Sequence, residues 1–297
     1  MHLVMATRRS ALALAQSRAF AEALAKASPV SVSELQIVTS GDKTQDRSLQ
    51  DIGGKGLFIK ELEEALLDGR ADFAVHSIKD VPALLAPMLT LACVPAREDP
   101  RDVLVSKSGA RLAELPSGAV VGTSSLRRSV AVLTARPDLR VEPVRGNVDT
   151  RLRRVTEGPF DAVILALAGL KRLGIEERAT EILEPSICLP AVGQGALGIE
   201  CREGDDSTIA ALVAVTDAEA WLCVAAERAV MAAVEGSCRT PIAAFAEREG
   251  ETMRLRAMLA EPDGTRPRHG ERRLAWPKGA ADAERAGRDL GDELRRG

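Results

Sequence analysis

Short apolar, β-branched runs alternate in this chain with longer segments of helical periodicity, and this alternation restricts the possible folds more than any other feature. A strand-like run at residues 3–7 precedes an Ala/Leu-rich helical stretch at 10–27, and another strand-like run follows at 32–38. A helix around 57–67 and a strand at 71–77 continue the series. Strands separated by helices predict βα units and a mostly parallel sheet, so the expected fold class is α/β.

A second series of the same kind begins near residue 119 and ends near residue 174, and the pattern changes after a strand-like run at 197–201. From Asp217 a long helical stretch leads through a Gly/Ser turn into two strand-like runs and a charged final helix. This α+β part, about 80 residues long, is within the size range of a domain of its own. The length of 297 residues likewise predicts two or three domains.

Charge and composition exclude several classes of function. A formal net charge of -3 gives the chain as a whole no electrostatic reason to bind nucleic acid or an anionic membrane. No run reaches the ~18 apolar residues of a membrane span, and the first residues, MHLVMATRRSALALAQ, do not have the order of a signal peptide. The five spread-out cysteines contain no CxxC pair, which argues against a disulfide framework or a zinc site. We therefore expect a cytoplasmic protein with reduced thiols and no metal.

Arginines recur where predicted strands pass into helices. Arg127 and Arg128 fall in the first turn of a helix, where a cation opposes the helix dipole; Arg145 precedes the next helix and Arg151 lies in it. Guanidinium groups bind carboxylates through two parallel hydrogen bonds, and ligands of open α/β sheets bind at strand ends. We interpret these four arginines as a site for a polycarboxylate. The alternative, a solvated helix face paired with local acids, is favoured for the arginines at 153–154.

Two glycine-containing segments resemble nucleotide-binding motifs only superficially. The polar segment 40–58 is long and rich in glycine, as lids over sites often are, but Leu49 and Gly56 occupy positions where a Walker A loop needs glycine and Ser or Thr. GQGALG at 193–198 matches G-x-G-x-x-G, yet a strand-like run follows it instead of the helix that a pyrophosphate site requires. We expect a lid at 40–58 and no dinucleotide site at 193–198.

Asp80 lies at the end of the strand predicted at 71–77, beside Lys79 and ahead of Pro82. The residues alone leave two interpretations open. An aspartate near a proline is typical of a turn, whereas a carboxylate at a strand end can stabilise a developing cation and handle protons. His76 is expected to be a core histidine with a partner rather than a catalytic base.

Cys238 differs from the other cysteines. It lies in a Gly/Ser turn after a helix, beside Arg239, which favours the thiolate, and an accessible thiolate is a nucleophile. The other four fall inside apolar runs and are expected to be small core residues. These are Cys93, Cys188, Cys201 and Cys223.

Sequence blocks spread over most of the chain carry a more specific signal. They are ATRRSALALAQ, GGKGLFIKELE, DFAVHSIKDVP, EDPRD, VGTSSLRR, VRGNVDTRL, ILALAGLKRLG, LPAVGQGALGIECR and EGSCRTPIAAFAE. Together they resemble the porphobilinogen deaminase family, also called hydroxymethylbilane synthases. The resemblance implies a transferase that condenses four porphobilinogen molecules head to tail onto a dipyrromethane cofactor, with loss of ammonia each time, and then releases the linear tetrapyrrole hydroxymethylbilane by hydrolysis.

The resemblance also implies a fold and an assembly. Two α/β domains like those of type II periplasmic binding proteins are expected, the chain crossing to the second and back, followed by a smaller α+β domain. The implied boundaries are 1–95 with 196–214 for the first domain, 96–195 for the second and 215–297 for the third. The family further implies a monomer whose partner is the small-molecule substrate porphobilinogen.

Site residues follow from the same resemblance, position by position. Cys238 matches the cysteine that carries the cofactor through a thioether, and Asp80 matches the catalytic aspartate, which also contacts the cofactor. Further cofactor contacts implied are Ser77, Lys79, Thr123, Ser125, Arg127, Arg128, Arg145 and Gly146, and substrate contacts implied are Arg8, Ser10, Gln16, Lys55, Phe58, Arg145, Arg151, Arg172 and Gln194.

Two rival classes of function make different predictions. A solute-binding protein of the same two-lobed architecture would use the arginines without chemistry, and it predicts a signal peptide and no need for the turn around Cys238. An RNA-binding protein could use the arginine clusters, but aromatic residues make up only 2% of the chain and Tyr is absent, which leaves few platforms for base stacking.

Overall fold

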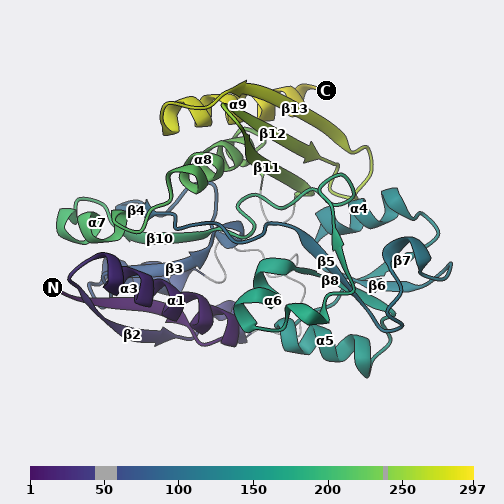
Figure 1. The fold of residues 1–297 in the computed structure, drawn as a ribbon, viewed down its shortest axis with the longest axis horizontal. Helices are drawn as coiled ribbons and strands as arrows, with labels where there is room; N and C mark the ends of the chain where they lie inside the picture. The colour runs from purple at the N-terminus through teal and green to yellow at the C-terminus, as the bar shows by residue number, and fades with distance from the viewer. Residues whose placement is uncertain (44–58, 237–239) are drawn as a thin grey trace. The chain divides into compact units, whose positions relative to one another are not determined.

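The computed structural model describes residues 1–43, 59–236 and 240–297 (Figure 1). Contacts between Cα atoms divide the chain into two compact units. The first comprises Met1–Glu98 and Ala196–Leu222, and the second comprises Asp99–Gly195 and Cys223–Gly297.

The first unit is built on a five-stranded sheet in the order β2-β1-β3-β10-β4. β1 runs parallel to β2 and β3, whereas β10, which arrives from much later in the chain, is antiparallel to β3 and β4. The elements are β1 (His2–Arg8), α1 (Ala11–Ala27), β2 (Ser31–Ile37), α2 (Ser40–Lys43), α3 (Lys60–Leu67), β3 (Phe73–Ser77), the 3-10 turn η1 (Ile78–Asp80), β4 (Leu89–Cys93), β10 (Leu197–Arg202) and α7 (Asp206–Val213).

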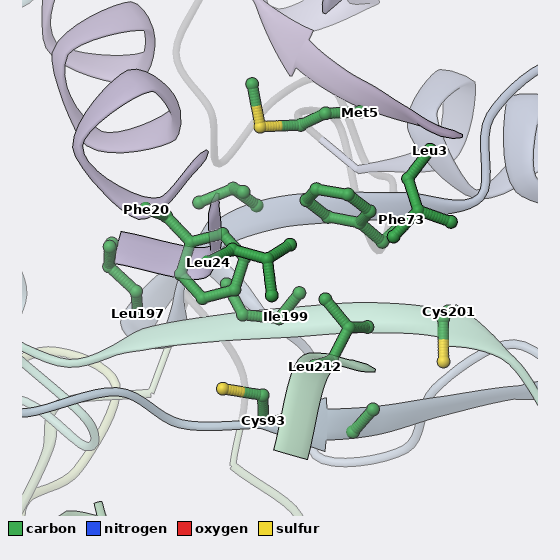
Figure 2. Close-up of a cluster of buried hydrophobic side chains, with 12 residues drawn as sticks. Leu3, Met5, Phe20, Leu24, Phe73, Cys93, Leu197, Ile199, Cys201 and Leu212 are labelled. Atoms are coloured by element: carbon green, nitrogen blue, oxygen red, sulfur yellow. The ribbon is translucent and has the colours of Figure 1, made fainter. Parts of the chain in front are cut away.

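Helix α1 supplies one face of this unit's core. Phe20 and Leu24 are one helical turn apart and both are buried, and the Phe20 ring meets Phe73 of β3 edge-on at 5.8 Å between centroids (Figure 2). Cys93 and Cys201 lie in the same cluster. Burial of a large apolar side chain contributes about 1.5–3 kcal/mol, so this face holds α1 firmly against the sheet.

The second unit contains a sheet of matching design, in the order β7-β6-β8-β5-β9. Again three strands are parallel, here β6 with β7 and β8, and an antiparallel strand, β5, separates them from the outermost one. The elements are β5 (Asp102–Ser106), η2 (Leu112–Glu114), β6 (Val120–Gly122), α4 (Leu126–Ala135), β7 (Arg140–Glu142), α5 (Val148–Thr156), β8 (Ala162–Ala166), α6 (Leu167–Leu173), η3 (Glu176–Arg178) and β9 (Glu181–Leu183).

The C-terminal part of the second unit is a three-stranded antiparallel meander with helices. Helix α8 (Ala218–Ala233), which begins in the first unit, leads to β11 (Ile242–Glu249), β12 (Thr252–Leu259), β13 (Arg268–Ala275) and α9 (Ala280–Arg296). Glycine allows α9 to approach α8 closely, because a Cβ atom at Gly287 would lie 2.1 Å from the Ala226 carbonyl oxygen. The α+β region expected from Asp217 onward is therefore confirmed.

The architecture confirms the expected fold class. Two mixed α/β sheets share one strand order, with an antiparallel strand inserted beside three parallel ones, and a smaller sheet-rich region follows them. Helix α3 (Lys60–Leu67) confirms the helix predicted around 57–67, of which residues 57–58 lie outside the described residues. The three domain boundaries stay a prediction.

Candidate active site

The end of strand β3 presents two charged side chains on a buried anchor. Ile78, the first residue of η1, is fully buried, and its N–H donates to the Ala196 carbonyl oxygen at 3.1 Å. Lys79 and Asp80 follow it and are exposed. The turn is closed by the Val81 N–H, which donates to the Ile78 carbonyl oxygen at 2.9 Å. The end of β3 was predicted to carry the catalytic carboxylate. Asp80 lies there in a turn that is anchored by buried Ile78, and its carboxylate is accessible.

Gly198 makes this anchor possible. It lies opposite His76 in the β3–β10 pairing, and a Cβ atom there would come within 2.3 Å of Cδ1 of Ile78. This glycine of the GQGALG segment therefore serves side-chain packing beneath η1. Strand β10 begins within this segment, at Leu197, and continues to Arg202, which confirms that no helix follows the segment as a dinucleotide site requires.

Gly198→Ala is expected to disturb the position of Asp80 as well as the packing. Overfilling a close-packed site costs about 1–3 kcal/mol of unfolding free energy, and the displaced Ile78 would carry η1 with it. Ile78→Val removes the clashing Cδ1, so the double variant should recover part of both stability and turnover, although the single Ile78→Val change costs about 0.5–1.5 kcal/mol. Thermal unfolding and initial rates are measured for the wild type, the two single variants and the double variant. If the losses of the two single variants simply added in the double variant, the packing argument would be contradicted.

Gln16 and Ser77, both predicted site residues, lie together in the first unit. The Gln16 side-chain amide donates to Ser77 Oγ at 3.2 Å. Ser10 occupies the N-cap of α1, where its hydroxyl oxygen accepts from the Ala13 N–H at 3.2 Å. Arg8, the last residue of β1, is half-buried. The substrate and cofactor roles of these four residues stay predictions.

His76 is a buried residue with a partner, as expected. Its Nε2 lies 2.9 Å from Oε2 of Glu200 in β10, and the two side chains are 4% and 1% exposed. Burial, helped by the charge of Glu200, raises the pKa of Glu63 on α3. Glu200 was not singled out from the sequence, although one acidic residue inside the apolar run LGIEC is the signal that could have found it.

The second unit buries Arg127 and Arg128 around one carboxylate. Oδ2 of Asp102 accepts from Arg127 at 2.7 Å, while Oδ1 accepts from Nε and an Nη atom of Arg128 at 3.0 and 2.7 Å. Asp102 is completely buried and the two arginines are 4% and 6% exposed. Burial alone would raise the pKa of Asp102, but the charges and hydrogen bonds of the two arginines outweigh it and hold that pKa well below its usual range.

Arg127 makes further contacts to the segment beyond β9. It donates to the Leu189 carbonyl oxygen at 2.7 Å and lies 3.2 Å from Sγ of Cys188. Burial raises the pKa of the Cys188 thiol to about 12, and the charge of Asp102 adds to this effect. The thiol is therefore neutral near pH 7. The Nε–H of Arg127 is buried without an acceptor among the described residues.

Gln194 joins this cluster from the GQGALG segment. Its side-chain amide donates to the Pro100 carbonyl oxygen at 2.6 Å and to Oδ1 of Asp102 at 3.0 Å. The neighbouring Gly193 N–H donates to Glu227 of α8 at 2.6 Å, and the second carboxylate oxygen of Glu227 accepts from the Ala246 N–H of β11 at 2.9 Å. Asp102 and Glu227 were not identified from the sequence, because their partners lie far away along the chain.

The remaining predicted arginines follow neighbouring strands. β6 runs parallel to β7 and β8, so the carboxyl ends of these strands share one edge of the sheet. Arg127 follows β6 and Arg145 follows β7 at that edge. Arg151 donates from Nε to the Gly146 carbonyl oxygen at 2.9 Å, and Arg172 donates to that of Gly195 at 2.6 Å. The topology thus brings two arginine groups to one edge.

Two further predicted cofactor contacts, Gly146 and Ser125, have distinctive local geometry. Gly146 has φ +101, a conformation that favours glycine, and a Cβ atom there would lie 2.6 Å from Thr150 Cβ. Ser125 is the N-cap of α4 but its side chain makes no cap hydrogen bond; instead its N–H donates to Oγ1 of buried Thr123 at 3.1 Å. The arginines at 153–154 are exposed, as favoured from the sequence.

Three predicted site residues, Lys55, Phe58 and Cys238, lie outside the described residues, as does most of the predicted lid at 40–58. The other four cysteines are buried, which confirms the expectation that they are core residues. No single helix of the described part is long and apolar enough to cross a membrane, although the bent pair α7 and α8 passes the same test of length and composition together.

Two family models match the chain. Residues 3–210 match the porphobilinogen deaminase, dipyromethane cofactor binding domain, and residues 221–296 match the porphobilinogen deaminase, C-terminal domain. A porphobilinogen deaminase of Sorangium cellulosum is 72% identical over 99% of both chains. One of Bordetella parapertussis is 50% identical over 97% of this chain and 92% of its own. Among solved structures, the VFT2 domain of Bordetella pertussis BvgS matches 72% of this chain and 86% of its own at 15% identity, with a TM-score of 0.46.

The matches first define a class: the chain is a transferase with a dipyrromethane-binding domain. It belongs to the porphobilinogen deaminase family. The resemblance noted in the sequence blocks is thereby confirmed, together with the reaction, in which porphobilinogen is converted to hydroxymethylbilane, and with the dipyrromethane cofactor. The alternatives of a solute-binding and an RNA-binding protein are set aside.

Proposed function

We propose that the chain carries out this condensation with Cys238 as the attachment point of the cofactor, Asp80 as the catalytic carboxylate and buried arginines of the second unit as ligands of the cofactor's carboxylates. The observation that supports the proposal most is the electrostatic state of the arginine cluster. Two guanidinium groups, one carboxylate and one neutral thiol leave a net charge of +1 around Arg127.

An anionic group fits this cluster chemically. The buried Nε–H of Arg127 has no acceptor among the described residues, and a buried donor without a partner is costly. A carboxylate supplies both the acceptor and the compensating charge. Each pyrrole of a dipyrromethane carries an acetate and a propionate, so the group offers such carboxylates. The residues that would hold it are Ser77, Lys79, Asp80, Thr123, Ser125, Arg127, Arg128, Arg145 and Gly146.

The dipyrromethane, when bound, supplies the pyrrole carbon to which the first substrate molecule is joined. The carboxylate of Asp80 accepts hydrogen bonds from pyrrole N–H groups. It also stabilises the positive charge that develops as ammonia leaves the substrate, and it transfers a proton. Its exposure on the anchored turn η1 supports this role, because an accessible carboxylate can reach a ligand. Substrate carboxylates and ring atoms are held by Arg8, Ser10, Gln16, Lys55, Phe58, Arg145, Arg151, Arg172 and Gln194.

We also propose a cytoplasmic monomer that binds neither nucleic acid nor a membrane. The net charge of -3 and the 2% aromatic content support the exclusion of nucleic acid and of anionic membranes. Its domains are residues 1–95 with 196–214, 96–195, and 215–297. The separate sheets, whose strands lie within residues 2–202, 102–183 and 242–275, support a division into three parts.

Intact mass spectrometry of the purified chain tests the cofactor directly. The measured mass is expected to exceed the sequence mass by two pyrrole units, and Ehrlich's reagent is expected to colour the protein. The urea-unfolded protein should keep both signals, because a thioether survives unfolding. A fully active protein of unmodified mass would contradict the covalent attachment.

A further inference from the structure

Asp102 is a buried carboxylate that contacts the arginines proposed to bind the carboxylates of the cofactor. Its negative charge weakens the attraction of these arginines for an anionic ligand. It accepts from Arg127, from two nitrogen atoms of Arg128 and from Gln194, and Cys188 Sγ lies 3.2 Å from its Oδ2. An anion in this position competes with any anionic ligand for the same cations. The contribution of Asp102 to ligand binding therefore cannot be electrostatic attraction of the ligand.

Two neighbouring guanidinium groups would be unstable here without it. Both are at least nine-tenths buried, so each loses most of its hydration, and they repel one another. The shared carboxylate offsets this cost and removes the rotational freedom of two long side chains. Further acceptors complete the restraint: Arg127 donates to the Leu189 carbonyl oxygen and Arg128 to that of Ile164, at 2.7 and 2.9 Å.

We propose that Asp102 is a positioning residue, which holds Arg127 and Arg128 in a fixed arrangement before the cofactor's carboxylates arrive. The proposal rests on the proposed role of the two arginines and deepens it. One carboxylate against two guanidinium groups keeps a single positive charge, and it leaves the Arg127 Nε–H for the ligand. Preorganised donors bind a ligand without the entropic cost of ordering them at that moment.

Asp102→Asn tests the proposal, because the side chain keeps its shape while its charge is lost and an NH2 group is turned toward arginine donors. The readout is the fraction of purified, folded protein that carries the cofactor mass and reacts with Ehrlich's reagent. We expect this fraction to fall by roughly tenfold or more, since loss of one partner of a buried ion pair leaves the other charges uncompensated. Folding is checked by near-UV circular dichroism.

Glu200→Gln is the matched control. Glu200 is also a buried carboxylate, 1% exposed and paired with His76, but it lies in the first unit. A general penalty for removing a buried carboxylate would affect both variants, whereas the proposal expects full cofactor content only in Glu200→Gln. If folded Asp102→Asn carried as much cofactor as Glu200→Gln, the proposed role of Asp102 would be overturned.

Two further arms separate this proposal from the proposed function. If the wild-type chain carries no added mass, the cofactor assignment fails; if Arg127→Gln and Arg128→Gln keep the cofactor, the role of the arginines fails. Loss of cofactor in those two variants but not in Asp102→Asn overturns only the positioning role of Asp102.

A measurement on chain without cofactor keeps the proposal falsifiable if Asp102→Asn does not fold. In the Cys238→Ser protein, the Nε–H resonance of Arg128, which donates to Oδ1 of Asp102, is expected to be sharp and slow to exchange with water, because the group is held before any ligand binds. Arg18, whose side chain is 58% exposed and whose Nε–H donates to Glu34, provides the reference for an ion-paired arginine at the surface. Exchange of the Arg128 Nε–H as fast as that of Arg18 would overturn preorganisation.

Discussion

Asp80→Asn is expected to reduce turnover by roughly 100- to 1,000-fold, the usual effect of removing one electrostatic stabiliser of a transition state. Asparagine keeps the shape of the side chain but neither carries the negative charge nor accepts a proton. Because Asp80 is exposed on η1 and its buried neighbour Ile78 anchors the turn, the fold should persist. The loss is therefore expected in kcat, with KM changed much less. Initial rates of hydroxymethylbilane formation, together with thermal unfolding, measure both parts.

Asp68→Asn provides the control for this variant. Asp68 is an exposed carboxylate at the end of α3 in the same unit, and it forms an ion pair with exposed Arg70. Exposed ion pairs contribute little, so neither rate nor stability is expected to change. The intact mass of Asp80→Asn shows separately whether the cofactor is still attached. A rate near that of the wild type would make the Asp80 carboxylate dispensable.

Cys238→Ser is expected to yield a chain of unmodified mass without measurable product formation. Serine cannot replace the thiolate as a nucleophile, because a hydroxyl is hardly ionised near neutral pH. The other four cysteines are buried, so they are not expected to replace Cys238. Burial raises the pKa of Cys93 and of Cys201 to about 11 and that of Cys188 to about 12, so about one thiol in ten thousand or fewer is ionised at pH 7.

Cys93→Ala is the matched control for the attachment site. Cys93 is fully buried in the core of the first unit, and its replacement by alanine removes one sulfur atom from an apolar cluster. Some stability is lost, but the cofactor mass is expected to be complete. Intact mass and the Ehrlich reaction of the two variants show which of them carries the cofactor. Cofactor on Cys238→Ser, or its loss from Cys93→Ala alone, would place the attachment elsewhere.

Local sequence patterns were informative for elements whose own residues decide their structure. The helical stretch at 10–27 became α1, whose Ser10 cap and buried Phe20 and Leu24 all lie within the segment itself. The strand at 71–77 became β3, and the run at 197–201 became β10. The turn at Asp80 was located from the same strand pattern, although its two interpretations could not be separated without the family resemblance.

The arginine cluster shows the limit of such patterns. Its position after β6 was found from the sequence, whereas its role in binding the carboxylates of a ligand stays a prediction. Asp102, which precedes Arg127 by 25 residues, was not found. No periodicity connects an acid in one strand with cations after another. Glu200 and His76 are separated by 124 residues and illustrate the same difficulty.

By itself, the sequence determined the α/β class, the C-terminal α+β region, the family and the chemical types needed at the site, because propensity, periodicity and specific motifs are properties of neighbouring residues. Only the tertiary structure decided which carboxylate pairs with Arg127 and Arg128 and why Gly198 must lack a side chain. Those features depend on contacts between residues that are distant along the chain, and burial sets their energies. Charge and desolvation act through space, so no linear pattern records them.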